Sequence, residues 1–480
     1  MKVHVDASRC CGIYQDPTCW QNSTLRYTPP GDFPPFLASR IGRAKLMRVF
    51  ITLDEFWDYE TDTIYPDFEI GVARRPVEQM RYPYDWALIV PAPYGTRFEE
   101  YLTSHAANAE ELLLNVRRCE REVADGVITC DQYEEVFYRA VEYCKRLAPN
   151  IRYIECCNEV DIADVGVRNA QEYVNMYLRA RSAILRLNEK YQYPIPLEIG
   201  GYAAAHPLHK WDMMEDVMRL LVQNGLGKKP MDFCSYHMYN VPENIHLVRE
   251  GKDELTRLGG VEKLQLILQQ HHQMIQKLGL TDVPVFLNEI GKARATGVDG
   301  DSLHNAAGVL TYLNAFCMGG LPGAYPSPWC TFHNPKLQMS YTQYLRSADG
   351  SYQATPNGIA LEMLHGLHGE RLQCTVTDAC GADARYYALA VGNEEEYAVL
   401  CVNPTGDTVG CYTEISGLPK GEYRMEIYRC NFRDNNCISG TGDGTLQMTE
   451  QLQYAVTAES ILHTEVLDKD GFVLLKLHKI

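Results

Sequence analysis

The 480-residue sequence lacks an excess of basic residues, and this shortage argues against two classes of partner. Lys and Arg number 45 against 62 Asp and Glu, which gives a formal net charge of −17, and the basic residues form no cluster along the chain. A surface that binds nucleic acid or an anionic membrane needs a basic footprint. We therefore expect no nucleic acid and no membrane as partners; neutral or cationic small molecules suit this charge better.

Long apolar stretches are also missing. No segment approaches 18 consecutive apolar residues, so no transmembrane helix is expected. The first ten residues, MKVHVDASRC, lack the charged region and the apolar region of a secretory signal. These absences favour a cytoplasmic protein.

No Cys-x-x-Cys pair occurs, although the chain holds seventeen cysteines. The absence argues against zinc and thioredoxin-like sites. Several cysteines lie inside apolar runs, among them Cys156, Cys157 and Cys401. We interpret them as reduced, buried, small hydrophobic side chains, which agrees with a cytoplasmic location.

Short apolar runs alternate with longer helical segments between residues 45 and 370. The runs are continuous rather than alternating, as in strands that a parallel sheet buries on both faces. No Gly-rich phosphate loop follows an early strand, which disfavours a Rossmann domain and favours a (β/α)8 TIM barrel of the α/β class. The first strand should lie before residue 45. The other runs are Leu46–Thr52, Trp86–Pro91, Ile151–Cys157, Pro196–Gly200, Phe233–Tyr236, Val283–Leu287 and a weaker one near Ala324–Phe332.

The segments between these runs have helical periodicity. Thr129-Cys-Asp-Gln132 predicts a capping box, since the Thr hydroxyl and the Gln amide can satisfy each other's backbone donors. We expect His271 and His272, which lie on one such segment, at the surface. Helices are predicted near Asn169–Lys190, Trp211–Asn224, Val261–Leu278, Leu303–Phe316 and Asn357–His368.

After about residue 370 the pattern changes to short runs separated by Gly, Asn, Asp and Pro, which is typical of an antiparallel β-sandwich. The run Lys2–Asp6 precedes the barrel pattern and is expected to join the sandwich. The predicted domains are therefore an N-terminal strand (residues 1–15), a catalytic barrel (16–370) and a C-terminal sandwich (371–480). The sandwich runs are Tyr386–Val391, Tyr397–Val402, Tyr412–Ile415, Tyr423–Tyr428 and Phe472–Leu477.

Two apolar runs of the barrel end in a carboxylate. The run from Ile151 ends in Asn158-Glu159, and the run from Val283 ends in Glu289. Active sites of barrels lie at the C-terminal ends of the strands. A single Glu at a strand end is most simply solvated, but two at equivalent places suggest the carboxyl pair that retaining glycoside hydrolysis requires.

A third run ends in His237-Met-Tyr239, whose two functional side chains lie on the same side of a strand. A lone His-x-Tyr is more often a packing pair than part of a site. Trp329, near the end of the eighth run, is either a platform for a sugar ring or a core residue. Trp57, Asp54 and His333 are weaker candidates for lining the pocket.

The order of Asn-Glu at the fourth strand, His-x-Tyr at the sixth and Glu at the seventh resembles clan A retaining glycoside hydrolases. The resemblance implies that Glu159 is the acid/base and Glu289 the nucleophile. It also implies that Asn158 bonds the sugar 2-hydroxyl and that Tyr239 orients Glu289.

Three further segments look like glycoside hydrolase family 39, the β-xylosidase and α-L-iduronidase family. Leu46-Met-Arg48-Val-Phe is similar to its second strand, Glu198-Ile-Gly-Gly201 to its fifth, and Tyr428–Asn436 to a stretch of its sandwich. Two positions depart from the family pattern. Cys157 stands where many relatives carry Trp, and the segment Phe50–Glu55 lacks a His-Gly pair, so the identity of the sugar stays open.

In the mechanism that this resemblance implies, Glu289 attacks as an anion and Glu159 starts protonated. Tyr239 and Arg48 should then keep the pKa of Glu289 low, while burial and the charge of Glu289 should raise the pKa of Glu159. A carbohydrate substrate, either a glycoside or an oligosaccharide, is the expected partner, and no cofactor or metal is needed. Such an enzyme would serve carbohydrate metabolism.

Two alternatives use the same residues. The chain could be a catalytically inactive carbohydrate-binding barrel, or a barrel hydrolase that acts on another bond. Sugar binding without turnover of any aryl glycoside would indicate the first. The oligomeric state also stays open, with a homo-oligomer as one option.

Overall fold

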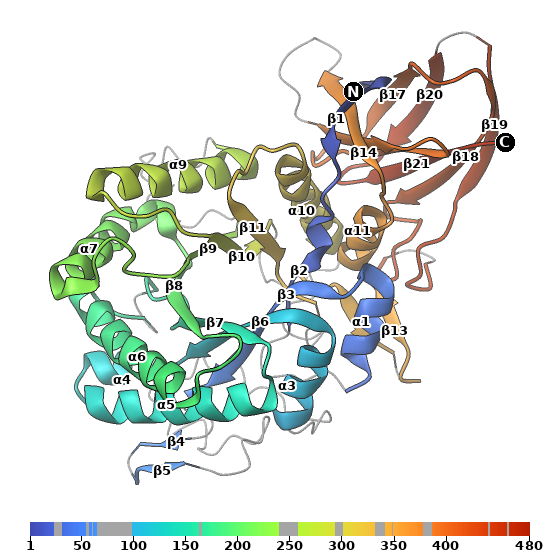
Figure 1. Cartoon of the computed structure of the whole chain (residues 1–480). Coiled ribbons are helices and arrows are strands. Elements are labelled where there is room, and N and C mark those ends of the chain that lie inside the picture. Colours follow the sequence, from blue (N-terminus) through green and yellow to red (C-terminus); the bar gives the residue numbers. More distant parts are fainter. Residues whose placement is uncertain are drawn as a thin grey trace.

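A computed structural model gives the fold of the chain (Figure 1). It describes residues 1–23, 31–53, 57–59, 61–64, 98–162, 166–239, 258–292, 301–331, 341–347, 349–377, 386–439, 442–457 and 460–480.

Eight parallel strands form the barrel, in the order β11-β10-β9-β8-β7-β6-β3-β2. The Asn22 side chain on β2 donates to the carbonyls of Ser327 and Pro328 on β11, both at 3.3 Å, and so joins the two ends of the sheet. The predicted (β/α)8 barrel is confirmed. Its strands are β2 (Trp20–Asn22), β3 (Ala44–Thr52), β6 (Ala109–Arg117), β7 (Ile151–Cys156), β8 (Glu198–Ala204), β9 (Cys234–Tyr239), β10 (Val285–Gly291) and β11 (Ala324–Pro328).

Two strands of the barrel, β2 and β6, were not predicted from the sequence. The first strand, which the apolar pattern did not locate, is β2. The third place in the sheet belongs to β6, whose Leu112-Leu113-Leu114 core lies between β3 and β7. The run Trp86–Pro91, predicted to be a strand, lies outside the described residues.

Helices surround the barrel (Figure 1). The predicted capping box is present at the start of α5, where the Thr129 hydroxyl accepts from the Gln132 amide at 3.2 Å and Gln132 accepts from the Thr129 amide at 3.0 Å. The described helices are α1 (Phe33–Ile41), α3 (Phe98–Ala107), α4 (Glu120–Ala124), α5 (Cys130–Leu147), α6 (Ala170–Tyr191), α7 (Trp211–Leu221), α9 (Gly260–Leu278), α10 (Asp301–Cys317) and α11 (Pro356–His365), with short helical turns η1 (Pro17–Cys19), η4 (Pro207–His209) and η5 (Val222–Leu226).

A nine-stranded sheet, in the order β19-β18-β21-β16-β15-β14-β1-β17-β20, forms the second unit beside the barrel (Figure 1). Strands near the two ends of this sheet come together: Arg429 on β18 pairs with Glu465 on β20 at 2.6 Å. The sheet therefore folds over on itself. Its strands are β1 (Lys2–Ile13), β14 (Glu370–Thr377), β15 (Tyr387–Gly392), β16 (Glu396–Val402), β17 (Val409–Ser416), β18 (Gly421–Cys430), β19 (Glu450–Val456), β20 (Ser460–Leu467) and β21 (Phe472–Lys479); two small hairpins, β4 (Trp57–Asp58) with β5 (Thr63–Ile64) and β12 (Tyr344–Arg346) with β13 (Tyr352–Ala354), complete the list.

The N-terminal strand joins this second sheet, as its position in the sequence predicted. β1 pairs antiparallel with β14 but parallel with β17, so the predicted antiparallel sandwich is mixed at one place. Both termini lie in this unit (Figure 1). The exact division into residues 1–15, 16–370 and 371–480 stays a prediction.

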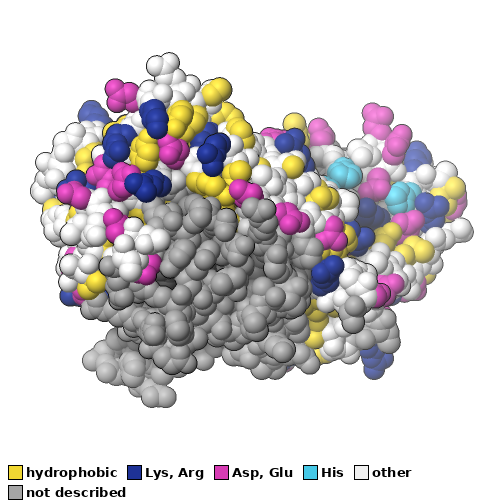
Figure 2. All heavy atoms as spheres, turned by 90° about the horizontal axis from the view of Figure 1, so that it is seen from below, with side chains coloured by type: hydrophobic (Ala, Val, Ile, Leu, Met, Phe, Trp, Pro, Cys, Tyr) yellow, Lys and Arg dark blue, Asp and Glu magenta, His cyan; other side chains and the backbone are white. Residues whose placement is uncertain are grey.

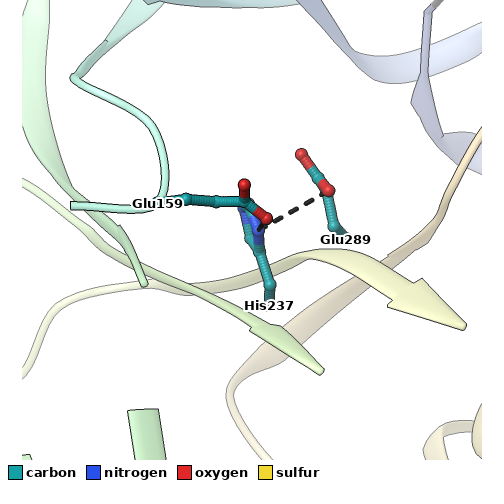
Figure 3. A group of neighbouring side chains, drawn as sticks. All are labelled: Glu159, His237 and Glu289. Atoms are coloured by element: carbon teal, nitrogen blue, oxygen red, sulfur yellow. Dashed lines mark hydrogen bonds and ion pairs between the residues drawn. The ribbon is translucent and has the colours of Figure 1, made fainter. Parts of the chain in front are cut away.

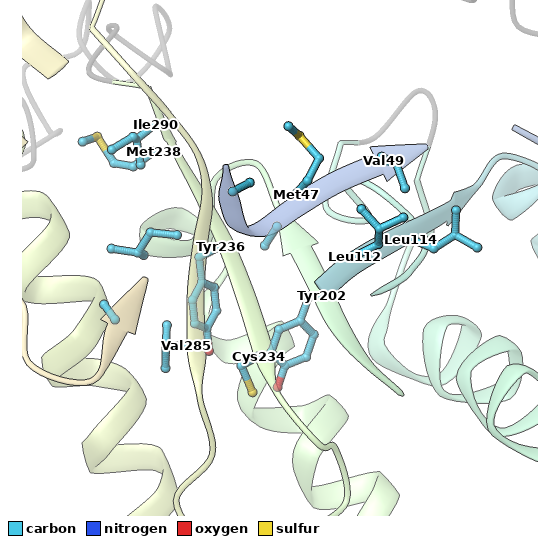
Figure 4. Close-up of a cluster of buried hydrophobic side chains, with 14 of the residues drawn as sticks. Met47, Val49, Leu112, Leu114, Tyr202, Cys234, Tyr236, Met238, Val285 and Ile290 are labelled. Atoms are coloured by element: carbon cyan, nitrogen blue, oxygen red, sulfur yellow. The ribbon is translucent and has the colours of Figure 1, made fainter. Parts of the chain in front are cut away.

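The barrel strands bury both faces. Their outward side chains, such as Val49, Leu114 and Tyr236, pack against the surrounding helices (Figure 4). Inside the barrel, Leu46, Leu113, Tyr153, Phe233 and Phe286 form a separate apolar cluster. This double burial explains why the sequence shows continuous apolar runs.

Surface charges of both signs are interspersed on the described part of the face in Figure 2. Among the described residues, no helix combines the length and the apolar character that a membrane span requires. No disulfide bond joins any two of the sixteen described cysteines, and most of them are buried, as predicted.

Candidate active site

Three side chains from one part of the barrel sheet meet at the C-terminal end of the barrel. Glu159 follows β7, His237 lies on β9 and Glu289 lies on β10 (Figure 3). His237 Nδ1 lies 3.3 Å from Glu159 Oε1 and 3.5 Å from Glu289 Oε2. All three ligand atoms, one from each residue, lie within 4.8 Å of one another. The two carboxylates predicted from separate strand ends therefore share one small space.

Each oxygen of Glu289 has its own donor. Arg48 Nη1 donates to Oε1 at 2.6 Å, and the Tyr239 hydroxyl donates to Oε2 at 2.6 Å. The Glu289 side chain is 8% exposed, so these charge-assisted bonds compensate for its loss of water. The predicted contacts of Arg48 and Tyr239 with Glu289 are both present.

Arg48 is a shared cation. Besides Glu289, it donates to Glu155 Oε2 at 2.8 and 2.7 Å and to Asn158 Oδ1 at 2.7 Å. Burial opposes the charge on Arg48, but the two carboxylates outweigh burial and raise its pKa. One buried guanidinium thus fixes the positions of three side chains at the barrel mouth.

Glu155 is a central site residue that sequence reasoning did not single out. It is fully buried on β7 and also accepts from Asn115 at 2.6 Å and from Asn288 at 2.5 Å. Burial raises its pKa, but Arg48 and the other donors lower it on balance. Its place four residues before Glu159, inside a buried apolar run, was the available signal, because a carboxylate there needs a partner.

The backbone around Asn158 is held in an uncommon conformation. Cys157 has φ +70° and Glu159 has φ +52°, a left-handed region that costs roughly 1–2 kcal/mol for a non-glycine residue. The Cys157 amide donates to Val116 at 2.9 Å and the Glu159 amide to Ala203 at 2.7 Å. These bonds from both neighbouring strands hold Glu159 toward His237.

The pKa of Glu159 differs from the expectation. Burial raises it, but the hydrogen bond and charge of His237 outweigh burial, with further help from His206 and Arg118, and lower it overall. The predicted rise is therefore wrong for the free protein. The Glu159 side chain remains 27% exposed, whereas His237 is fully buried.

The remaining candidates fall into three groups. Trp329 is 4% exposed and packs edge-on to Phe50, in a cluster that includes Tyr239, so it lies beside the site but is buried. Trp57 is also buried and bonds Asp62 at 3.1 Å. Asp54 and His333 lie outside the described residues.

His271 and His272 were both expected at the surface, and this prediction is wrong for His271 but confirmed for His272. His271 is fully buried, and its Nδ1 lies 3.1 Å from the Tyr236 hydroxyl. His272 is 42% exposed. Helical periodicity separates adjacent residues by about 100°, so one of the two points inward.

No protein-family model and no curated protein matches the chain. Solved structures do match over its whole length. A glucosidase from Croceicoccus marinus shares 15% identity at a TM-score of 0.62, covering 100% of this chain and 99% of that one. The GH39 enzyme from Xanthomonas axonopodis pv. citri shares 15% identity at a TM-score of 0.65, covering 100% of this chain and 97% of that one. A monomeric beta-xylosidase from Caulobacter crescentus CB15 shares 14% identity at a TM-score of 0.65, covering 100% of this chain and 99% of that one.

At these identities the likeness shows the fold alone. The fold is shared with glycosidases of glycoside hydrolase family 39, which confirms, at the level of fold, the resemblance inferred from the sequence motifs.

Proposed function

We propose that this chain is a retaining glycoside hydrolase in which Glu159 is the acid/base and Glu289 the nucleophile. A β-xylosidase-like activity is the first to test, since one similar structure is named a beta-xylosidase. The other roles follow from position: Asn158 binds a sugar hydroxyl, and His237, Tyr239 and Arg48 place the two carboxylates.

The separation of the two carboxylates carries the proposal. Retaining enzymes hold their carboxyl groups about 5–5.5 Å apart, whereas inverting enzymes leave about 6.5–9.5 Å for a water molecule. An oxygen of Glu159 and an oxygen of Glu289 lie within 4.8 Å. This distance supports direct attack by Glu289 rather than attack by water.

The reaction then proceeds in two balanced steps. A Glu289 oxygen bonds the anomeric carbon while the glycosidic C–O bond breaks, and the leaving oxygen takes the proton of Glu159. Water next attacks the anomeric carbon, its proton passes to Glu159, and the bond to Glu289 breaks. Arg48 and Tyr239 stabilise the Glu289 carboxylate before attack and after release.

A panel of aryl glycosides, led by the xyloside, tests the proposal with the wild type and Glu289→Gln. We expect turnover by the wild type, with retained configuration in the first product seen by NMR, and a loss of at least roughly 1,000-fold in Glu289→Gln. Glu422→Gln, at an exposed position on β18, is the matched control and should keep full activity.

Full activity of Glu289→Gln would refute the assignment. Binding of sugars by the wild type without hydrolysis of any glycoside would instead favour the inactive carbohydrate-binding barrel.

A further inference from the structure

Glu159, His237 and Glu289 also have the chemistry of a metal-binding group. Two carboxylate oxygens and one imidazole nitrogen converge from three strands (Figure 3). Imidazole together with carboxylate suits Zn²⁺ and related transition-metal ions. We propose that these three residues bind a divalent transition-metal ion, with Zn²⁺ as the reference case, and that the bound ion blocks the active site.

The distances fit tetrahedral coordination. Zn–N and Zn–O bonds of about 2.0–2.2 Å in a tetrahedron place neighbouring ligand atoms about 3.4 Å apart. His237 Nδ1 lies 3.3 Å from Glu159 Oε1 and 3.5 Å from Glu289 Oε2, so two edges already match. The third edge, between the carboxylates, is at most 4.8 Å. A shift of Glu159, the most exposed of the three side chains, would close it.

The charge of the site also favours a cation. Glu155, Glu159 and Glu289 bring three carboxylates to the barrel mouth, and the guanidinium of Arg48 directly contacts two of them. Arg118 and His206 also act electrostatically on Glu159. With His237 neutral, as a metal ligand must be, the groups in direct contact are three carboxylates and one guanidinium, which leaves an excess of negative charge. A divalent ion would neutralise it.

The surroundings orient the ligands. The Tyr239 hydroxyl occupies one lone pair of Glu289 Oε2 and leaves the other for the ion, while Arg48 holds Oε1. His237 is fully buried on β9, which limits its rotation. Such outer hydrogen bonds normally strengthen a metal site.

Two features indicate reversible binding rather than a resident cofactor. His237 Nε2 is buried and has no hydrogen-bond partner among the described residues, whereas a metal-ligating His usually donates its second N–H to a partner. The guanidinium 2.6 Å from Glu289 also repels a second cation. We therefore expect an ion that binds and leaves, and that competes with the glycoside for the two carboxylates.

Binding of the ion does not depend on the proposed function, but inhibition rests on it. Both uses need the same oxygens of Glu159 and Glu289, so the ion and the reacting sugar exclude each other. Added Zn²⁺ should raise the apparent KM for an aryl glycoside, leave kcat unchanged, and be reversed by a chelator.

The test is a Zn²⁺ titration by calorimetry, in competition with a chromogenic chelator, together with the visible absorption of bound Co²⁺. Cys10 and Cys11 are exposed thiols that would also bind Zn²⁺, so the measurements use a Cys10→Ser, Cys11→Ser background. His237→Gln and Glu159→Gln remove one ligand each. His272→Gln removes a partly exposed imidazole elsewhere and is the matched control.

We expect one site per chain in the background protein and in the His272→Gln control. His237→Gln should weaken it by at least about 100-fold, because loss of even an outer hydrogen-bond partner costs about 10–100-fold in metal affinity. Glu159→Gln tests the same site should His237→Gln fail to fold.

Unchanged Zn²⁺ affinity in a folded ligand variant would overturn the site. Turnover that rises with Zn²⁺ and falls with the chelator would overturn the blocking role. Zn²⁺ binding that requires His237, in a protein that hydrolyses no glycoside, would contradict only the proposed function and would leave the metal site supported.

Discussion

Two layers of side chains inside the same barrel differ completely in character. The lower layer consists of Leu46, Leu113, Tyr153, Phe233 and Phe286. Two residues further along the same strands lie Arg48, Asn115, Glu155, Ser235 and Asn288, all buried and polar. Alternate residues of a strand point to the same side, so each of these five strand segments supplies one member to each layer. A step of two residues thus changes the barrel interior from an apolar plug to a charged network.

The two layers have different roles. The lower layer stabilises the barrel through packing, and the upper layer positions Glu159 and Glu289 through Arg48. Substitutions in the two layers should therefore separate stability from activity.

Removing the shared cation should have the largest effect. Arg48→Met leaves Glu155 and Glu289 as uncompensated buried charges, which typically costs about 3–5 kcal/mol of folding free energy. It also frees the nucleophile from its donor, so kcat/KM should fall by roughly 100-fold or more. Urea unfolding and aryl-glycoside kinetics check both effects. Wild-type kinetics in this variant would show that the reaction does not depend on Arg48.

An apolar truncation in the lower layer should affect stability alone. Phe233→Ala removes a buried ring that packs 5.1 Å from the Phe286 ring, and should cost about 3–5 kcal/mol. Activity per folded molecule should stay close to that of the wild type. If the kcat/KM of the folded fraction instead falls as far as in Arg48→Met, the two layers are not functionally distinct.

Two buried histidines, on helices α3 and α9, should make the fold sensitive to acid. Burial lowers the pKa of His105 and of His271 to about 4. In the unfolded chain these groups take up a proton near pH 6.5. Between pH 6.5 and 4 the unfolded state therefore binds more protons, and stability falls as the pH falls.

Each of these histidines should lower the free energy of unfolding by about 3 kcal/mol at pH 4, since each pKa unit is worth about 1.4 kcal/mol. Urea unfolding at pH 7 and pH 4.5 should show a smaller loss in His105→Gln than in the wild type. An equal loss in both would contradict the prediction.

His237, in contrast, should tune activity rather than stability. Its hydrogen bond and charge lower the pKa of Glu159 against the opposing effect of burial. A lowered pKa means that Glu159 keeps its proton only at acidic pH, so kcat/KM should fall as the pH rises from the acidic range. In His237→Gln the effect of burial remains, and the alkaline limb of the pH profile should move to higher pH. A limb that stays in place, or moves to lower pH, would exclude His237 as the cause.

The sequence predicted the strand ends better than the strand interiors. Glu159 and Glu289 were found because a carboxylate that ends an apolar run stands out against its neighbours. Glu155 was not recognised, because in a strand buried on both faces the apolar and polar sides do not alternate visibly. Strand β6 was also not predicted, although its Leu112-Leu113-Leu114 segment is as apolar as the run Trp86–Pro91.

The electrostatics of the site could not be read from the sequence. His237 lies 78 residues from Glu159 along the chain, and only the register of β7, β8 and β9 brings its Nδ1 within 3.3 Å. A rise in the pKa of Glu159 is what burial and the charge of Glu289 predict, and the contact with His237 reverses it. Position along a strand predicts which residues share a site, whereas their pKa values depend on distances of a few ångströms.

Covalent trapping most directly tests the claim that Glu289 attacks the sugar. Incubation of the protein with a 2-deoxy-2-fluoro glycoside that carries a good leaving group should add the mass of one fluorosugar, and peptide mapping should place it on Glu289. A label on another residue, or turnover with inverted configuration and no adduct, would contradict the account.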